Sequence, residues 1–242
     1  MVSSENQPQE KLQKVLASIG LASRRVVEDY IIDERITVNG EIAHIGQRVN
    51  RHEDQLLFDG VPLRVSPELT YYLIHKPLGI ISTAKDPQGR RTIVDLVPPE
   101  PRVYPVGRLD KETEGLILLT NDGDLTYRLT HPSHGIEKEY LVKVGKKLSR
   151  GSLRQLREGI TLDDGLTSPA RVSQIQDGVV KIVIHEGKNR QVRRMFQAVG
   201  HPVERLIRTR IGNLVDHTLQ SGQWRELTTL DLLHFEVDQV VD

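Results

Sequence analysis

The sequence predicts an α+β protein made of a small N-terminal module and a larger domain of mixed helices and strands. Apolar residues follow a helical spacing from Leu12, and a strand-like segment begins at Tyr71. A polar, proline-containing stretch at residues 65–68 separates these two regions. Because 242 residues can form a small domain and a medium-sized one, we expect two domains, at residues 9–66 and 69–242.

The N-terminal module is expected to contain two short helices followed by a small β element. Leu12, Val15, Leu16 and Ile19 follow the i, i+3, i+4, i+7 spacing of one helix face. Gly20 is placed to end this helix, and Ser23 can cap the next one through its side-chain oxygen. Asn39-Gly40 suits the positive φ angles of a type I′ turn, which predicts a tight hairpin over residues 36–42.

The larger domain is predicted to mix strands and helices. Residues 71–77 have the pattern of a strand closed by a proline, and residues 86–91 form a turn-rich basic loop. Asp177-Gly178 separates two β-rich runs, which indicates a second hairpin. A helix is expected to open near Asn189. Its apolar face comprises Val192, Met195, Phe196 and Val199.

Charge is balanced overall but segregated near the C-terminus. The chain carries 33 basic Lys and Arg residues and 33 acidic ones, so its formal net charge is zero. Residues 186–210 hold seven basic side chains and two acidic ones, whereas from Ile211 onward only Arg225 opposes six acidic side chains. Segregation of this kind can make a basic face on a neutral protein, which suits contact with a nucleic acid. Without further motifs, a solvated helix face followed by an acidic tail fits the same pattern.

Composition and motifs argue against several other classes of function. The chain has no cysteine, which excludes disulfides, iron–sulfur clusters and zinc sites with thiolate ligands. His131 and His134 have no nearby acidic cluster to complete a zinc site. The polar first ten residues do not resemble a signal peptide, and no apolar run reaches membrane-spanning length. We expect a soluble cytoplasmic protein, and the sequence contains no P-loop or dinucleotide-binding motif.

The segment 107–123 is the most informative part of the chain. Asp110 stands close to Arg108, just before an apolar β-rich run that ends at Asn121-Asp122-Gly123. An aspartate on a loop that feeds a strand can be held rigidly and still meet a ligand, as a catalytic nucleophile or acid requires. The spacing alone also fits an ordinary turn aspartate beside a solvated arginine.

Three later blocks follow this segment in a recognisable order. They are His131-Pro132-Ser133, residues 137–142 around Tyr140, and residues 186–195 around Asn189. Together with residues 107–123 they resemble the signature of the RsuA-type pseudouridine synthases, which isomerise uridine to pseudouridine in ribosomal RNA. The resemblance runs from about Leu12 to the C-terminus. It implies a large, mainly antiparallel sheet with helices packed outside it and an active-site cleft across it.

The resemblance implies catalytic roles for Asp110, Tyr140 and Arg193. Asp110 would start the reaction, by attacking covalently or by assisting proton removal from the sugar. Tyr140 would lie against the target base, with its phenol available for proton transfer. Arg193, rather than Arg190 or Arg194, aligns with the arginine that pairs with the catalytic aspartate. Because the reaction involves no redox change and no phosphoryl transfer, we expect no cofactor and no metal.

The resemblance also implies how RNA is held. The target uridine has to leave its helix to reach Asp110, so base flipping is expected. Arg108 is suited to filling the vacated stack or holding flanking phosphates. Leu206 aligns with an apolar residue that packs the base, and the adjacent Ile207 is an alternative. Further RNA contacts are expected from Lys188, Arg190 and Arg194.

The N-terminal module resembles the alpha-L RNA-binding domain first recognised in a small-subunit ribosomal protein. The resemblance is carried by Lys11-Leu12-Gln13-Lys14, Ala22-Ser23-Arg24-Arg25 and Val38-Asn39-Gly40. Through Glu68 the chain holds eight basic and eleven acidic side chains, so RNA contact needs a local patch. The residues expected to contact phosphates are Lys11, Lys14, Arg24 and Arg25.

The choice of RNA leaves alternatives open. Residues 86–90 and 187–191 look most like the large-subunit synthase B branch, which implies a stem–loop of 23S ribosomal RNA, or an assembling large subunit, as the partner. A small-subunit synthase is one alternative, and a ribosome assembly protein that binds RNA without chemistry is another. The joint presence of Asp110, Tyr140 and Arg193 favours catalysis. We expect a monomer.

Overall fold

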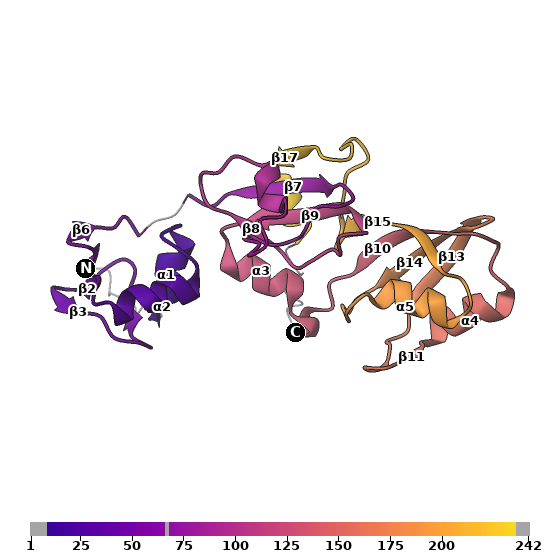
Figure 1. Ribbon diagram of the computed structural model, residues 1–242, viewed down its shortest axis with the longest axis horizontal. Helices are drawn as coiled ribbons and strands as arrows, with labels where there is room; N and C mark the ends of the chain where they lie inside the picture. The colour runs from indigo at the N-terminus through magenta and orange to yellow at the C-terminus, as the bar shows by residue number, and fades with distance from the viewer. Residues whose placement is uncertain (1–8, 66–67, 236–242) are drawn as a thin grey trace, which may run out of the picture. The chain divides into compact units, whose positions relative to one another are not determined.

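The computed structural model describes residues 9–65 and 68–235, which form an α+β protein (Figure 1). Three acidic residues of the C-terminal charge pattern lie outside these ranges, namely Glu236, Asp238 and Asp242. A membrane-spanning helix is absent from the described ranges, because none of their helices combines sufficient length with sufficient apolar character. The domain limits expected from the sequence, 9–66 and 69–242, stay a prediction.

The first of two compact units contains the described residues up to Thr70 and two short later segments, Glu100–Val103 and Asn121–Gly123. Its helices are α1 (Leu12–Ser18) and α2 (Arg24–Ile32). Its short strands are β1 (Glu10–Lys11), β2 (Ile36–Val38), β3 (Glu41–Ile42), β4 (Arg48–Val49), β5 (Leu56–Phe58) and β6 (Val61–Pro62). Strands β3, β2, β5 and β6 pair in that order, and β1 pairs with β4.

The two helices of this unit are stabilised by burial of their apolar faces in one small core. Leu12 and Leu16 of α1 and Val27 of α2 are inaccessible to solvent. Helix α1 ends at Ser18, and Gly20 adopts a φ angle of +86° just beyond it. The predicted helix and its glycine stop are therefore confirmed.

Local hydrogen bonds and turn geometry confirm the other elements predicted for this unit. The Ser23 side chain accepts a hydrogen bond from the backbone N–H of Val26 at 3.4 Å and so caps α2. Asn39 and Gly40 have φ angles of +53° and +87° and connect β2 to β3. Two successive positive φ angles are what a type I′ hairpin requires.

The second compact unit contains the remainder of the described chain. Its strands are β7 (Tyr71–Lys76), β8 (Tyr104–Pro105), β9 (Glu114–Thr120), β10 (Lys138–Val144), β11 (Thr161–Leu162), β12 (Gly165–Leu166), β13 (Arg171–Gln176), β14 (Val179–Ile184), β15 (Val203–Ile211), β16 (Leu214–Val215) and β17 (Trp224–Glu226). Its α-helices are α3 (Gly123–Thr130), α4 (Arg150–Glu158), α5 (Gln191–Ala198) and α6 (Thr229–Leu233). Two 3-10 helices span Ile93–Leu96 and Pro132–His134.

A sheet of nine strands, counted over the described residues, forms the frame of this unit. Its main order is β13-β14-β10-β15-β9-β7-β17, with β16 beside β15 and β8 beside β9. The pairing of β9 with β15 is parallel, and the other pairings within this sheet are antiparallel. The predicted mainly antiparallel sheet is therefore confirmed.

Two apolar cores pack the helices against different parts of this sheet (Figure 1). Helices α4 and α5 cover strands β10, β13 and β14, and Phe196 of α5 is fully buried there. Leu125 and Leu129 of α3 pack with residues of β7 and β9. The predicted apolar face of α5 is confirmed, and the helix begins at Gln191, directly after Arg190 in a left-handed conformation.

Other sequence-based expectations for this unit are confirmed, with one difference in detail. Strand β7 ends at Lys76, immediately before Pro77, and Asp177-Gly178 joins β13 to β14. Strand β9 ends at Thr120, as the turn signal predicted. The following Asn121-Asp122-Gly123 leads into helix α3, because Gly123 is already its first residue.

The parallel pairing brings the backbones of β9 and β15 unusually close at Gly115. A Cβ atom at this position would lie 2.2 Å from the Arg208 carbonyl oxygen, and the φ angle of Gly115 is +105°. Only glycine fits both the space and the backbone conformation. The close approach places β9, which follows the Asp110 loop, beside β15, which carries Leu206.

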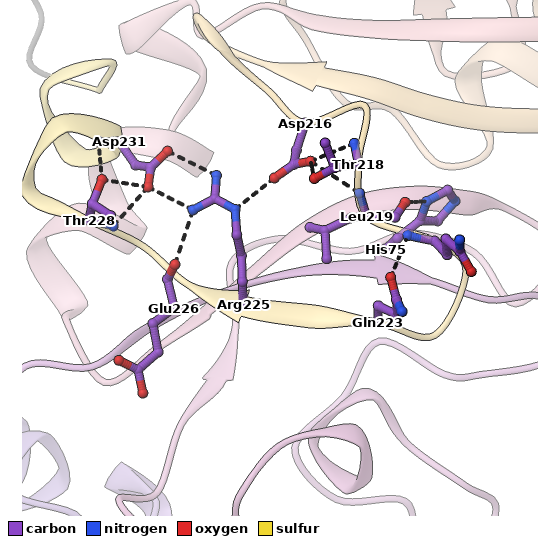
Figure 2. Close-up of polar contacts among 10 residues, drawn as sticks. His75, Asp216, Thr218, Leu219, Gln223, Arg225, Glu226, Thr228 and Asp231 are labelled. Atoms are coloured by element: carbon purple, nitrogen blue, oxygen red, sulfur yellow. Dashed lines mark hydrogen bonds and ion pairs between the residues drawn. The ribbon is translucent and has the colours of Figure 1, made fainter.

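The C-terminal edge of the sheet is held by an ion-pair network around Arg225 (Figure 2). Its guanidinium donates to Asp216 at 2.6 Å and to both carboxylate oxygens of Asp231 at 2.7 and 3.0 Å. Asp231 also forms a capping box with Thr228 at the start of α6. Because β17 pairs with β7, this network supports the strand that ends at Lys76, beside the Asp110 loop.

This network predicts a loss of stability in acid. Burial opposes ionisation of Asp216, but hydrogen bonds from Arg225 and Thr218 outweigh it and lower the pKa of Asp216 to about 2. The ionised carboxylate therefore stabilises the fold above its ordinary pKa of about 4, and that contribution, about 2 kcal/mol, is lost as the pH falls from 4 to 2. Urea unfolding followed by the fluorescence of Trp224 measures this window.

Arg225→Met should be less stable than the natural protein at neutral pH, and the difference should shrink as the pH falls to 2. Arg154→Met is the matched control, because Arg154 and its partner Glu158 are mostly exposed and contribute little. Equal acid sensitivity of the Arg225 variant and the natural protein would contradict this account.

Candidate active site

A pocket of about 310 Å³ in the second unit brings together Asp110, Tyr140 and Leu206. Arg108 also lines it, as do residues of the turn that leads into α5. The resemblance to the family predicted that these side chains share one site. They lie on separate elements: Asp110 on a loop, Tyr140 on β10 and Leu206 on β15. The structure therefore brings together one carboxylate, one phenol and one apolar side chain around a space that could hold a base.

Asp110 lies half-buried on the loop between β8 and β9. Its carbonyl accepts a hydrogen bond from the Thr113 N–H at 3.0 Å, which closes a turn. Before it, the buried Ser82 side chain donates to the Leu109 carbonyl at 2.9 Å and accepts from the Leu109 N–H at 3.2 Å. These contacts hold the backbone on both sides of Asp110 while leaving its carboxylate at the pocket.

A buried lysine supports the same loop from behind. Lys76 has no exposed surface, and its ammonium donates to the carbonyls of Pro77 and Ile80 at 2.9 Å and of Lys111 at 3.5 Å. Burial lowers the pKa of Lys76 to about 8, against the opposing effect of nearby carboxylates that include Asp110. Lys76 thus adds positive charge and backbone anchoring close to Asp110.

Tyr140 and Leu206 reach the pocket from neighbouring strands. Tyr140 pairs in register with Arg208, and Leu206 pairs with Val142, so alternation places Tyr140 and Leu206 on the same face. Leu206 is 4% exposed and lines the pocket. Ile207 does not line the pocket, because adjacent side chains of a strand point to opposite faces.

Arg193 lies near Asp110 but does not form a direct ion pair with it in the described structure. Its guanidinium donates to the Glu112 carbonyl at 2.6 Å and to the Val203 carbonyl at 3.3 Å. Burial, and then Arg190, lower the pKa of Arg193, whereas Asp110 and Glu112 act in the opposite direction. The arginine therefore clamps the Asp110 loop through its backbone, and its charge lies within electrostatic range of the carboxylate.

Glu112 binds two arginines beside the Asp110 loop. Its carboxylate accepts a hydrogen bond from Arg190 at 2.8 Å, and its carbonyl binds Arg193. The hydrogen bond from Arg190 is the main reason that the pKa of Glu112 is lowered. Arg190, expected to contact RNA, and Arg193, expected to act on Asp110, therefore both bind Glu112.

The other basic residues predicted to contact RNA differ in whether their side chains already bind other protein groups. Arg108 is exposed and has no hydrogen bond or ion pair among the described residues. Arg194 forms a two-pronged pair with Asp164 at 2.8 and 2.9 Å, and Lys188 donates to the carbonyls of Asp164 and Gly165. Arg108 can therefore meet a phosphate or base without breaking an existing contact, whereas Lys188 and Arg194 have protein partners.

In the first unit, three of the four predicted RNA-contact residues are exposed. Lys11, Arg24 and Arg25 lie at the starts of α1 and α2, and none forms an ion pair within the described ranges. Lys14 is partly buried and pairs with Glu10 at 2.8 Å. The exposed side chains flank helix N-termini, where backbone donors also favour phosphate oxygens.

Sequence reasoning missed several residues that shape the site. Ser82 and Lys76 contact the Asp110 loop from distant segments, and no local pattern indicated this. Thr113 lies inside the recognised segment; it is 2% exposed, lines the pocket, and its hydroxyl has no partner within the described residues. A buried polar atom of this kind is available to a ligand. Within the described ranges, no cluster of three or more His, Asp or Glu side chains could hold a metal ion.

Comparison with known families identifies the class of this protein. Residues 70–198 match the family model described as RNA pseudouridylate synthase, and residues 10–56 match the S4 domain. The chain belongs to the RNA pseudouridine synthase family. The family predicted from the sequence is therefore confirmed.

Individual relatives agree with this assignment over nearly the whole chain. "Ribosomal large subunit pseudouridine synthase B" of Bacillus subtilis is 42% identical over 227 residues, which cover 90% of this chain and 92% of the relative. The protein with the same name in Vibrio vulnificus is 40% identical and covers 92% and 73%. A solved structure described as a pseudouridylate synthase superposes with a TM-score of 0.69 at 32% identity, covering 93% of this chain and 99% of that one.

Proposed function

We propose that this enzyme isomerises a specific uridine of large-subunit ribosomal RNA to pseudouridine, with Asp110 as the catalytic carboxylate. The observation that carries the proposal is the pocket in which Asp110, Tyr140 and Leu206 meet beside an unpaired Arg108. The names of the relatives from Bacillus subtilis and Vibrio vulnificus support the large subunit as the source of the RNA.

The reaction needs few protein groups, because the product is an isomer of the substrate nucleotide and has the same atomic composition. The bond between N1 of uracil and C1′ of ribose breaks, the base turns within the pocket, and C5 bonds to C1′. The proton on C5 then leaves for solvent, and N1 gains a proton. Asp110 starts the reaction either by attacking C1′ or by assisting removal of a ribose proton.

The remaining pocket residues hold the freed base and handle protons. Leu206 supplies an apolar surface that tolerates rotation of the uracil, because it makes no directional contact. Tyr140 lies against the base, and its phenol is the candidate group for the proton transfer at C5. Arg193 fixes the loop through the Glu112 carbonyl and places a positive charge near the Asp110 carboxylate.

Access to the pocket requires the target nucleotide to leave its stack. Asp110 lines a pocket formed by side chains of separate elements of the protein. A base that is still stacked in an RNA helix could not enter this pocket and reach Asp110. Arg108 is exposed at this position and carries a planar guanidinium. It can occupy the space left by the flipped base or hold the flanking phosphates.

Release of tritium tests the proposed reaction directly. Transcripts of large-subunit and small-subunit ribosomal RNA are labelled with tritium at C5 of uridine, and the purified enzyme is added. We expect release from the large-subunit transcript that reaches a plateau at a single site, because C5 loses its hydrogen in each turnover. Release from the small-subunit transcript alone would move the proposal to that RNA, and release from neither would contradict it.

The N-terminal module is expected to contribute affinity through phosphate contacts. In the intact chain, the triple variant Lys11→Ala, Arg24→Ala, Arg25→Ala should bind RNA more weakly. It should also show a shallower dependence of log K on log salt, by about 2 to 3 units in slope, because fewer counterions are released. Fluorescence anisotropy over a range of salt concentrations measures both.

Arg154→Ala is the control for this experiment, since it removes a surface cation that is already paired with Glu158. An unchanged salt slope in the triple variant would exclude these residues as phosphate contacts.

A further inference from the structure

Three exposed aromatic rings gather at the end of helix α3, in a segment to which the proposed chemistry assigns no role. The ring centroids of Tyr127 and His131 lie 4.7 Å apart, and those of Tyr127 and His134 lie 5.4 Å apart in an edge-on arrangement. Tyr127 keeps 55% of its surface exposed, and both histidines are exposed. A cluster of rings that is largely open to water is an unusual use of apolar surface.

Local hydrogen bonds order the backbone that carries the rings and also hold the His131 ring. The His131 N–H donates to the Tyr127 carbonyl at 2.9 Å, which continues α3 into the turn. Nδ1 of His131 accepts from the Ser133 N–H at 3.3 Å and lies 2.7 Å from the Ser133 hydroxyl. Gly135, with a φ angle of +58°, ends the short 3-10 helix after His134. The backbone of this surface and its His131 ring therefore have little conformational entropy to lose when a ligand stacks there.

The helix end that carries the cluster lies close to the start of the Asp110 loop. A Cβ atom built on Gly107 would lie 3.5 Å from the methyl group of Thr130, so the end of α3 lies against the backbone where this loop begins. Arg108 follows Gly107 and lines the pocket. Beyond His134 the chain enters β10, which carries Tyr140.

The charge around the cluster favours a nucleic acid over an apolar partner. Arg128 lies next to Tyr127 on α3, is exposed, and has no ion-pair partner within the described ranges. Arg108 is likewise exposed and unpaired there. Exposed aromatic rings, with exposed arginines on the same helix and on the nearby loop, suit an unstacked nucleobase and its phosphate, because the ring stacks on the base and the guanidinium meets the charge.

We propose that Tyr127, His131 and His134 form a stacking site for a nucleobase that neighbours the flipped uridine in the RNA substrate. This inference rests on the proposed function, since it takes the same RNA as its ligand. The site is distinct from the pocket for the target base, because none of the three rings lines that pocket. It gives the enzyme a contact with an unpaired base beside the target, and so a preference for a loop over a continuous helix.

A double-mutant cycle between protein and RNA tests the proposal. RNA stem–loops that contain the target uridine are prepared with an abasic nucleotide at successive neighbouring positions, and their affinities are measured by anisotropy. At one of these positions the abasic change should weaken binding to the natural enzyme about tenfold. Tyr127→Ala should weaken binding of the intact RNA by a similar factor and should show no further loss with that abasic RNA.

Conservative and remote variants separate stacking from general damage. Tyr127→Phe keeps the ring and should restore the affinity that Tyr127→Ala loses. His131→Leu removes a second ring from the same exposed site and should repeat the effect at the same RNA position. Trp224→Leu removes a partly exposed ring on β17 and should leave the abasic profile unchanged.

The inference and the proposed function fail in different ways. If Tyr127→Ala and His131→Leu both bind every RNA as the natural enzyme does, while that enzyme releases tritium normally, the stacking site is wrong and the function stands. If the natural enzyme releases no tritium from the RNA, the proposed function is wrong. Additive losses for the variants and the abasic RNAs at every position would also overturn the stacking site.

Discussion

Replacing Asp110 by asparagine is expected to reduce pseudouridine formation by about four orders of magnitude or more, because the proposed catalytic carboxylate is lost. The substitution keeps the size of the side chain. Within the described residues the Asp110 carboxylate forms no hydrogen bond, so the fold should survive the change. Tritium release under single-turnover conditions, with RNA binding measured in parallel, separates the loss of chemistry from a loss of affinity.

Glu112→Gln is the matched control for this prediction, since it removes a carboxylate from the same loop. It weakens the contact with Arg190 but leaves the Glu112 carbonyl available to Arg193. We expect a loss of activity of about tenfold or less. If Glu112→Gln lowered activity as far as Asp110→Asn, the decisive factor would be the total charge of the loop and not the carboxylate of Asp110.

Replacing Gly115 by alanine is expected to destabilise the second unit by about 4 kcal/mol or more. The new Cβ atom would lie 2.2 Å from the Arg208 carbonyl oxygen and 2.5 Å from the Arg208 nitrogen, so β9 and β15 would have to separate. These strands carry the end of the Asp110 loop and Leu206, and the variant should therefore lose activity as well. Urea unfolding followed by Trp224 fluorescence measures the loss of stability.

Gly79→Ala distinguishes the clash at Gly115 from backbone strain. Gly79 also has a positive φ angle, +83°, but a Cβ atom there meets nothing within 4 Å. Its replacement should cost about 1 to 2 kcal/mol, the strain of a left-handed alanine alone. Equal stability losses at the two positions would show that the close approach to β15 is not the reason for Gly115.

Much of the site could be predicted because its residues lie in short ordered blocks. The loop with Asp110, the strand with Tyr140 and the helix that begins after Arg190 each have a local pattern that predicts the element. The resemblance to the family supplied the role expected of each side chain. Alternation along β15 then decides between Leu206 and Ile207 once the register is known. Local patterns and the family resemblance together therefore pointed to side chains that line the pocket, but not to the contacts between them.

The remaining features depend on contacts between distant segments. The sequence does not reveal that Ser82 binds the backbone of Leu109, or that Lys76 reaches the carbonyl of Lys111. The expected pairing of Arg193 with Asp110 takes a different form, because the guanidinium binds a carbonyl of the same loop. The parallel pairing at Gly115 is equally non-local: its signal was a glycine inside a strand pattern, which indicates a close backbone approach but does not name the neighbour.

The measurement that tests the central claim most directly is a pseudouridine map of total ribosomal RNA from cells with and without this gene. Carbodiimide modification followed by reverse transcription marks each pseudouridine as a stop. We expect one large-subunit stop, in a stem–loop near the peptidyl-transferase region, to disappear without the gene. It should return with the natural protein but not with Asp110→Asn. A map that is identical in the two strains would contradict the proposed modification of ribosomal RNA, and rescue by Asp110→Asn would contradict the role of the carboxylate.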